Sequence, residues 1–179
     1  NAGPGYGGSC LPKDMKALIK FAKIAGVKPT LLNAVEDVNT KQLEEVISIA
    51  KKKLGVLESK KITILGTSFK PNTDDIRDSI AIELIKQLLK RKVKVTVHDP
   101  KAIENTKNEF KKKINYAKSI SDAILGSQCV IIMTQWKQYE KLANNDFKQM
   151  KKGLIIDCRR MLAEKQLDVD YYAIGLGKK

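Results

Sequence analysis

The first third of the chain carries apolar residues at helical spacing. Between residues 12 and 25 they recur every three or four positions, and Gly26 is the expected stop of this helix. A second helix is predicted to begin near Pro29 and to run to Leu54, ahead of Gly55. Its length of about 25 residues corresponds to roughly 38 Å, longer than an ordinary globular helix, and favours a domain link or an interface. The alternative is a core helix that packs on the first.

From residue 60 onward, short β-branched runs alternate with amphipathic segments. The runs that we expect to form strands are 61–66, 93–97, 115–117, 129–134, 154–157 and 171–174. The segments that we expect to be helical are 79–91, 102–112, 121–126 and part of 135–153. Such alternation predicts an α/β fold with a doubly wound, mostly parallel sheet, in which ligands bind at the carboxyl ends of the strands.

Composition limits the compartment and the ligands. The chain has 179 residues, 42% of them hydrophobic, which is enough for one or two cores. No apolar run approaches the ~20 residues that a membrane span requires, so we expect no membrane segment. The three cysteines lack metal-ligand spacing and their odd number suits a reducing cytosol, so we expect a cytoplasmic protein without a metal site. Cys129 is predicted to be core, and Cys158 to be either packed or near a ligand.

The net charge of +14 raises the question of nucleic-acid binding. Thirty of the 34 basic residues are lysines, dispersed among glutamates and apolar helical positions as on a solvated surface. Arginine, the better fork for phosphate and base edges, is rare, and few aromatic residues lie near the lysines to stack on bases. We therefore expect no nucleic-acid partner, although the charge would attract an anionic substrate.

A glycine-rich run directly precedes one of the cysteines. Four glycines among residues 3–8 let backbone N–H groups approach a ligand, and the thiol of Cys10 follows at once. Pro12 suits a first helical turn, so Cys10 is predicted to lie near a helix N-terminus, where partial positive charge favours the thiolate. Asp14 lies one turn further on the same side. These are the parts of covalent catalysis, whereas the alternative is a glycine hinge before a helix with a small buried cysteine.

Three runs resemble motifs of the UDP-glucose/GDP-mannose dehydrogenase family, in the family's order. Gly-Tyr-Gly-Gly-Ser-Cys-Leu-Pro-Lys-Asp at 5–14 resembles the catalytic-cysteine signature. The run 66–79 resembles the nucleotide-binding loop, and Asp-Cys-Arg-Arg at 157–160 resembles the late Asp-x-Arg motif. Together they cover essentially the whole chain. The resemblance implies an oxidoreductase of polysaccharide biosynthesis that converts a sugar C6 alcohol to a carboxylate with two NAD⁺.

The resemblance also implies roles in the chemical steps. Cys10 would be the nucleophile that holds the aldehyde-level carbon as a thiohemiacetal and then as a thioester. Asp14 would act as the general base for the hydrolytic water. Tyr6 and Gly7 would line the sugar site. Lys13 would favour the thiolate and counts among the cofactor-binding residues, although its ordinary interpretation is a solvated lysine.

The second and third motifs imply binding roles. Phe69 and Lys70 would contact the nucleotide sugar, with Lys70 as a point charge for a phosphate. Arg159 would meet the substrate, and Arg160 beside it leaves the register of that motif open.

Two further residues have two open interpretations each. Arg77 matches a family arginine that reaches NAD, and the alternative is an ion pair with Asp74 or Asp75. Asp99 follows a predicted strand, where dinucleotide-binding domains place a ribose-binding acid, and the alternative is turn chemistry before Pro100.

The chain departs from the family pattern in one respect. No Gly-x-Gly-x-x-Gly lies between a predicted strand and a helix. We therefore expect the family's N-terminal NAD-binding domain to be absent and the chain alone to be inactive. The expected parts are 1–56, a catalytic-cysteine loop with a helical linker and dimerisation region, and 57–179, a Rossmann-like UDP-binding domain. The expected partners are a UDP-sugar, a second copy through the long helix, and the NAD-binding half.

UDP-glucose is the favoured substrate, because Tyr6 and the pair Ser9–Cys10 resemble UDP-glucose members of the family. Leu11 and the following Pro-Lys-Asp are shared with GDP-mannose members. The N-acetylated-sugar branch usually has His where this chain has Ser9. The alternatives are a GDP-mannose or other nucleotide-sugar dehydrogenase, or a non-catalytic module for nucleotide-sugar binding and dimerisation.

Overall fold

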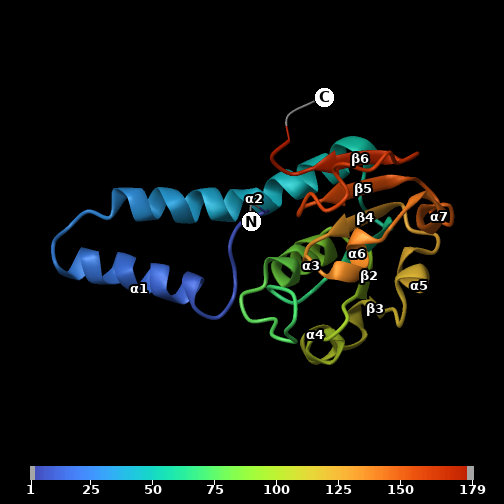
Figure 1. The fold of residues 1–179 in the computed structure, drawn as a ribbon. Coiled ribbons are helices and arrows are strands. Elements are labelled where there is room, and N and C mark those ends of the chain that lie inside the picture. The colour runs from blue at the N-terminus through green and yellow to red at the C-terminus, as the bar shows by residue number, and fades with distance from the viewer. Residues whose placement is uncertain (1–2, 177–179) are drawn as a thin grey trace.

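Two long helices lie side by side at the start of the chain and extend away from the sheet (Figure 1). A computed structural model describes residues 3–176. Helix α1 (Leu11–Ile24) carries Pro12 in its first turn, and Gly26, at φ +74°, follows its C-terminus. Helix α2 (Thr30–Leu54) ends at Gly55, at φ +72°. Both helices match their predicted positions to within a residue.

The two helices bury little of their surface against the rest of the chain. Pro12 is the buried residue of α1, and the buried residues of α2 lie from Leu43 onward, in its second half. Large apolar side chains are exposed along the outer part of both helices: Leu18, Phe21, Ile24, Leu31 and Val38. This pair of helices therefore presents an apolar surface to its surroundings.

The rest of the chain forms a six-stranded sheet in which every described pairing is parallel. The strands are β1 (Lys61–Leu65), β2 (Lys94–His98), β3 (Asn115–Tyr116), β4 (Cys129–Ile132), β5 (Leu154–Asp157) and β6 (Asp170–Ala173). Their order is β3-β2-β1-β4-β5-β6, so the strand order reverses between β1 and β4. This is the predicted doubly wound α/β arrangement, with its switch point beside β1.

Helices cover both faces of the sheet (Figure 1). The second half of α2 lies on one face with α3 (Ile80–Lys90) and α4 (Ile103–Phe110), which runs into a 3₁₀ turn at Lys111–Lys113. The shorter helices on the other face are α5 (Ile120–Ile124), α6 (Lys137–Glu140) and α7 (Asn144–Phe147). Two buried clusters, one on each face, hold the layers together.

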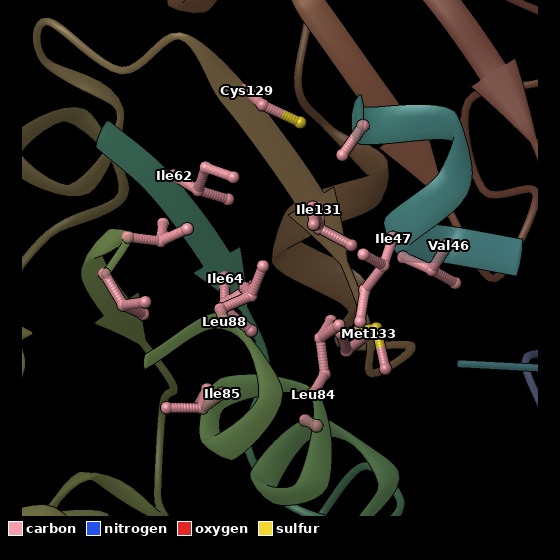
Figure 2. Packing of buried hydrophobic residues seen from close by; sticks show 14 of the residues in the cluster. Val46, Ile47, Ile62, Ile64, Leu84, Ile85, Leu88, Cys129, Ile131 and Met133 are labelled. Atoms are coloured by element: carbon pink, nitrogen blue, oxygen red, sulfur yellow. The ribbon is translucent and has the colours of Figure 1, made fainter. Parts of the chain in front are cut away.

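The larger cluster joins α2 to the sheet (Figure 2). Ile62 and Ile64 of β1 point to the same face, as residues two apart in a strand do. Leu84 of α3 and Ile47 of α2 belong to the same buried cluster. Because all four side chains are at most 5% exposed, the last turns of α2 belong to the core of the sheet domain.

Candidate active site

The glycine-rich loop before α1 is tied to α2. The backbone N–H of Tyr6 donates to Asn39 Oδ1 at 2.7 Å, and Asn39 Nδ2 donates back to the Tyr6 carbonyl at 3.1 Å. The Tyr6 hydroxyl donates to the Glu36 carboxylate. Burial, together with this hydrogen bond and the Glu36 charge, raises the pKa of Tyr6 to about 12. One side-chain amide thus holds the main chain of the loop against the helix.

The other side of this loop packs on the sheet domain. Gly8 donates its N–H to the Asp78 carbonyl at 3.3 Å. Its φ is +92°, and a Cβ at this position would lie 2.6 Å from the Phe69 ring. A Cβ on Gly3 would lie 2.2 Å from Arg159 Nη1. Only glycine allows the main chain to come this close, so the glycines bring the loop into contact with Phe69 and Arg159.

A pocket of about 250 Å³ opens between this loop and the carboxyl ends of the strands. Four predicted substrate residues line it: Tyr6, Gly7, Phe69 and Arg159. The fifth, Lys70, is exposed beside the pocket, with its Nζ 5.3 Å from the centroid of the Phe69 ring. Residues far apart in the sequence thus converge where a doubly wound sheet binds its ligands.

Arg159, rather than Arg160, lines the pocket. Its Nε donates to the Met133 carbonyl at 2.7 Å, and its backbone N–H donates to Asp157 Oδ1 at 2.9 Å. Burial lowers the pKa of the guanidinium, but arginine stays protonated in proteins. The site therefore contains a fixed positive charge.

Cys10 lies at the N-cap of α1 and is exposed. The predicted position near a helix N-terminus is confirmed, and the alternative of a small buried cysteine is wrong. The next residue, Leu11, lines the pocket. Asp14 donates its backbone N–H to the Cys10 carbonyl at 2.8 Å, which places it one turn along the helix. Its carboxylate is exposed and lies 3.2 Å from Nζ of Lys13, which is exposed as well.

Arg77 lies in a neighbouring groove of about 530 Å³. It holds Asp75 through two nitrogens, with Nη2 at 2.7 Å from Oδ2 and Nε at 3.0 Å from both oxygens. The ion pair with Asp75 that we expected as the alternative is present. The hydrogen bonds and the charge of Asp75 raise the pKa of Arg77.

The loop after β1 can be compared with the loop that binds the diphosphate in dinucleotide-binding domains. In dinucleotide-binding domains, backbone N–H groups of this loop face the diphosphate. Here the N–H groups of Thr67 and Ser68 donate to Asp99 Oδ2 at 2.8 and 3.0 Å. Of the two interpretations of Asp99, turn chemistry is the one that the structure supports. A carboxylate of the chain itself therefore occupies the N–H donors that a dinucleotide-binding domain offers to a diphosphate.

The remaining cysteines and the lone histidine lie in packed surroundings. Cys129 and Cys158 are buried, and burial raises the pKa of both thiols. His98 Nδ1 lies 3.0 Å from the Tyr139 hydroxyl, and burial lowers its pKa. Within residues 3–176, no group of three or more His, Cys, Asp or Glu side chains could hold a metal ion. Over the same span, no helix is both long and apolar enough to cross a bilayer.

Sequence reasoning missed the residues that hold the site in place. Asn39 lies four residues from both Val35 and Leu43, on the apolar stripe of the predicted helix. A polar residue on such a stripe signals a buried partner, but nothing in the sequence names Tyr6 as that partner. Glu36, Ser68 and Asp99 were likewise not recognised as structural partners of the site.

Comparisons with known proteins cover both parts of the chain. Residues 63–164 match the UDP binding domain of the UDP-glucose/GDP-mannose dehydrogenase family, and residues 1–41 match its central domain. A UDP-glucose 6-dehydrogenase of Haloferax volcanii is 38% identical over 173 residues, which are 97% of this chain and 39% of that protein. One from Bacillus subtilis is 36% identical over 180 residues, which are 97% of this chain and 40% of that protein.

Solved structures show the same relation. A UDP-glucose dehydrogenase from Pyrobaculum islandicum superposes with a TM-score of 0.89 and 32% identity, over 98% of this chain and 39% of that one. A GDP-mannose dehydrogenase from Pseudomonas aeruginosa shares the fold, with a TM-score of 0.81 and 22% identity, over 97% of this chain and 40% of that one. The chain thus spans about two fifths of the length of these relatives.

Proposed function

Because the chain belongs to the UDP-glucose/GDP-mannose dehydrogenase family, we propose that it is the UDP-sugar-binding, cysteine-bearing part of a UDP-glucose 6-dehydrogenase. One observation carries the proposal. The pocket at the carboxyl ends of the strands joins the glycine loop to Phe69 and Arg159, and its lining includes Leu11, the residue that follows the exposed Cys10. This arrangement suits a ligand with an anionic nucleotide at one end and a reacting sugar carbon at the other.

The nucleotide would lie against the sheet domain. The Phe69 ring offers an apolar face, and Lys70 and Arg159 supply positive charge for the phosphates or the sugar hydroxyls. The glycine loop, held by Asn39, would close over the sugar and present its C6 toward the start of α1. UDP-glucose is the proposed substrate, with GDP-mannose or another nucleotide sugar as the alternative.

Cys10 and Asp14 would share the covalent chemistry. Loss of a first hydride from C6 and of the hydroxyl proton would turn the C6 alcohol into an aldehyde. The Cys10 thiolate would then add to this aldehyde, so that a carbon–sulfur bond forms and the carbonyl oxygen takes up a proton. Loss of a hydride and of that proton turns this thiohemiacetal into a thioester. Asp14 then removes a proton from water, which attacks the thioester carbon, and the thiolate leaves as the carboxylate product forms.

NAD⁺ would accept the two hydrides of this oxidation. The loop after β1 would not be its site, since Asp99 accepts from the N–H groups of Thr67 and Ser68. We place the NAD site in the part of the full-length enzyme that this chain does not span, with Arg77 and Lys13 facing it. The chain alone would then bind substrate without turnover, and the complete enzyme would act in the cytoplasm, in polysaccharide biosynthesis.

A second copy of the chain would cover the apolar surface of α1 and α2. Leu31 and Phe21 are 76% and 68% exposed, which is unfavourable for side chains of their size in a monomer. The long helix α2 would thus both carry the dimer interface and hold the site loop through Asn39.

Calorimetric titration of the chain tests the nucleotide assignment. We expect UDP and UDP-glucose to bind, and GDP-mannose and NAD⁺ to bind more weakly or not at all. Tight binding of NAD⁺ with no binding of UDP would overturn the assignment. Preferred binding of GDP-mannose would select the alternative substrate.

A further inference from the structure

One buried carboxylate gathers donors from three segments at the carboxyl end of the sheet. Asp99 is 3% exposed. Its Oδ2 accepts from the N–H of Thr67 at 2.8 Å, from the N–H and Oγ of Ser68 at 3.0 Å each, and from Trp136 Nε1 at 3.2 Å. Its Oδ1 accepts from the N–H groups of residues 101 and 102, at 2.9 and 2.8 Å. Asp99 therefore links the turn after β2, the loop after β1 and the segment after β4.

The loop that Asp99 holds leads directly into the candidate site. Ser68 and Phe69 both line the pocket. The Ser68 carbonyl accepts from Thr134 Oγ1 at 2.7 Å. The N–H, the hydroxyl and the carbonyl of Ser68 are thus all hydrogen-bonded within the protein. Phe69 directly follows Ser68, and its ring lies close to Gly8 of the glycine-rich loop. The orientation of the loop after β1 therefore decides where the Phe69 ring lies against the glycine-rich loop.

The contacts of Asp99 involve the same loop N–H groups with which dinucleotide-binding domains bind a ligand phosphate. In such domains the loop after the first strand offers its N–H groups to a phosphate. We propose that Asp99 is a positioning residue that takes the place of this anion. It fixes the loop from inside the protein, so that Phe69 and the pocket are set for a nucleotide sugar before it binds. The proposal rests on the proposed function, because it deepens the assignment of the same pocket.

The chain offers a direct spectroscopic reporter of this arrangement. Trp136 is the one tryptophan of the sequence, and its indole N–H donates to the same oxygen that holds Ser68. A change in that hydrogen bond alters the fluorescence of a single residue. We therefore expect the binding of UDP beside Ser68 and Phe69 to change the Trp136 emission.

Asp99→Asn tests the role with little change in shape. Whichever way the Asn amide is turned, its NH₂ group faces N–H donors, so one set of donors loses its acceptor. At least two donors lose their acceptor, and we expect the Kd for UDP to rise by about tenfold or more. We also expect the Trp136 emission to shift and its response to UDP to disappear.

A matched control separates positioning from a general loss of stability. Ile85→Ala removes buried side-chain atoms from α3, in the core on one face of the sheet, without touching the loop. Each variant is measured at the same interval below its own melting midpoint. We expect Ile85→Ala to keep the wild-type Kd and the wild-type fluorescence response. An equal loss of affinity in Ile85→Ala would overturn the proposal, and so would wild-type affinity in Asp99→Asn.

Two further results keep the test decisive. If Asp99→Asn does not fold, Trp136→Phe is the substitute, because it removes one donor to Asp99. Calorimetry should then show UDP binding that is severalfold weaker, and unchanged affinity would overturn the positioning role of Asp99. If the wild-type chain binds no UDP, the proposed function fails. Hydrogen exchange then decides the inference: faster exchange of the Thr67 and Ser68 amides in Asp99→Asn supports the hold on the loop, and unchanged exchange refutes it.

Discussion

The Asn39 amide holds the main chain of the glycine-rich loop at Tyr6, and the sequence analysis did not identify this role. Asn39→Ala removes both of its hydrogen bonds to the main chain of Tyr6, at 2.7 and 3.1 Å. Each such hydrogen bond contributes about 1 kcal/mol net. Their loss therefore destabilises the closed loop, the state in which Tyr6 is bound to α2, by about 2 kcal/mol relative to the open loop. That free energy corresponds to an increase of about 30-fold in the population of the open loop.

Hydrogen exchange at the Tyr6 amide measures this opening directly. We expect exchange to be about 30-fold faster in Asn39→Ala, and we expect UDP-glucose to bind more weakly because the loop must be ordered on binding. Asn33→Ala is the matched control, since it removes an amide from the same helix without touching either hydrogen bond to Tyr6. Unchanged exchange at Tyr6 in Asn39→Ala, or an equal increase in the control, would refute the reasoning.

Three further expectations follow from the geometry. Arg159→Lys keeps the positive charge but loses the planar guanidinium, whose Nε donates to the Met133 carbonyl while the group faces the pocket. Calorimetry should show UDP-glucose binding that is weaker by about tenfold, and unchanged affinity would remove Arg159 from the site. The pKa of Tyr6 is raised from 10.0 to about 12, so the neutral hydroxyl stabilises the loop on α2 below pH 10, and this contribution is lost as the pH rises through 12. The ultraviolet titration difference between wild type and Tyr6→Phe should show a midpoint near 12. A midpoint near 10 would contradict the burial of the hydroxyl and its contact with Glu36. Light scattering should show a dimer that Leu31→Asp converts to a monomer, and a monomeric wild type would count against the proposed interface.

Much of the fold could be predicted because it depends on local patterns. The runs of β1, β2, β4 and β5 are rich in Ile and Val, and α2 has a sustained apolar stripe that ends at Gly55, so their positions could be inferred from residue type and spacing. The exposure of Leu31 and Val38 could not be inferred. An apolar residue on a helix indicates a contact surface but not which molecule covers it.

Which residues converge on the candidate pocket could be predicted, but not the hydrogen bonds that connect them. Tyr6, Phe69 and Arg159 were expected to act together because of a resemblance between motifs, and the structure brings them to one pocket. Asp99 had two interpretations, and the choice between them depends on which way its side chain turns in three dimensions. The ion pair of Arg77 also depends on the direction of its side chain, and Arg77 keeps its proposed role toward NAD. Asp99 turns inward to the N–H donors of the loop after β1, and Arg77 turns to Asp75.

Mass spectrometry of the full-length enzyme carrying Asp14→Asn tests the central claim most directly. Loss of a general base slows hydrolysis by roughly 10²–10⁴-fold, so after turnover with UDP-glucose and NAD⁺ the peptide that contains Cys10 should carry a thioester-linked sugar nucleotide. Cys10→Ala should carry no adduct and should not complete the oxidation. An Asp14→Asn enzyme with a normal rate and no adduct, or a fully active Cys10→Ala enzyme, would contradict the account.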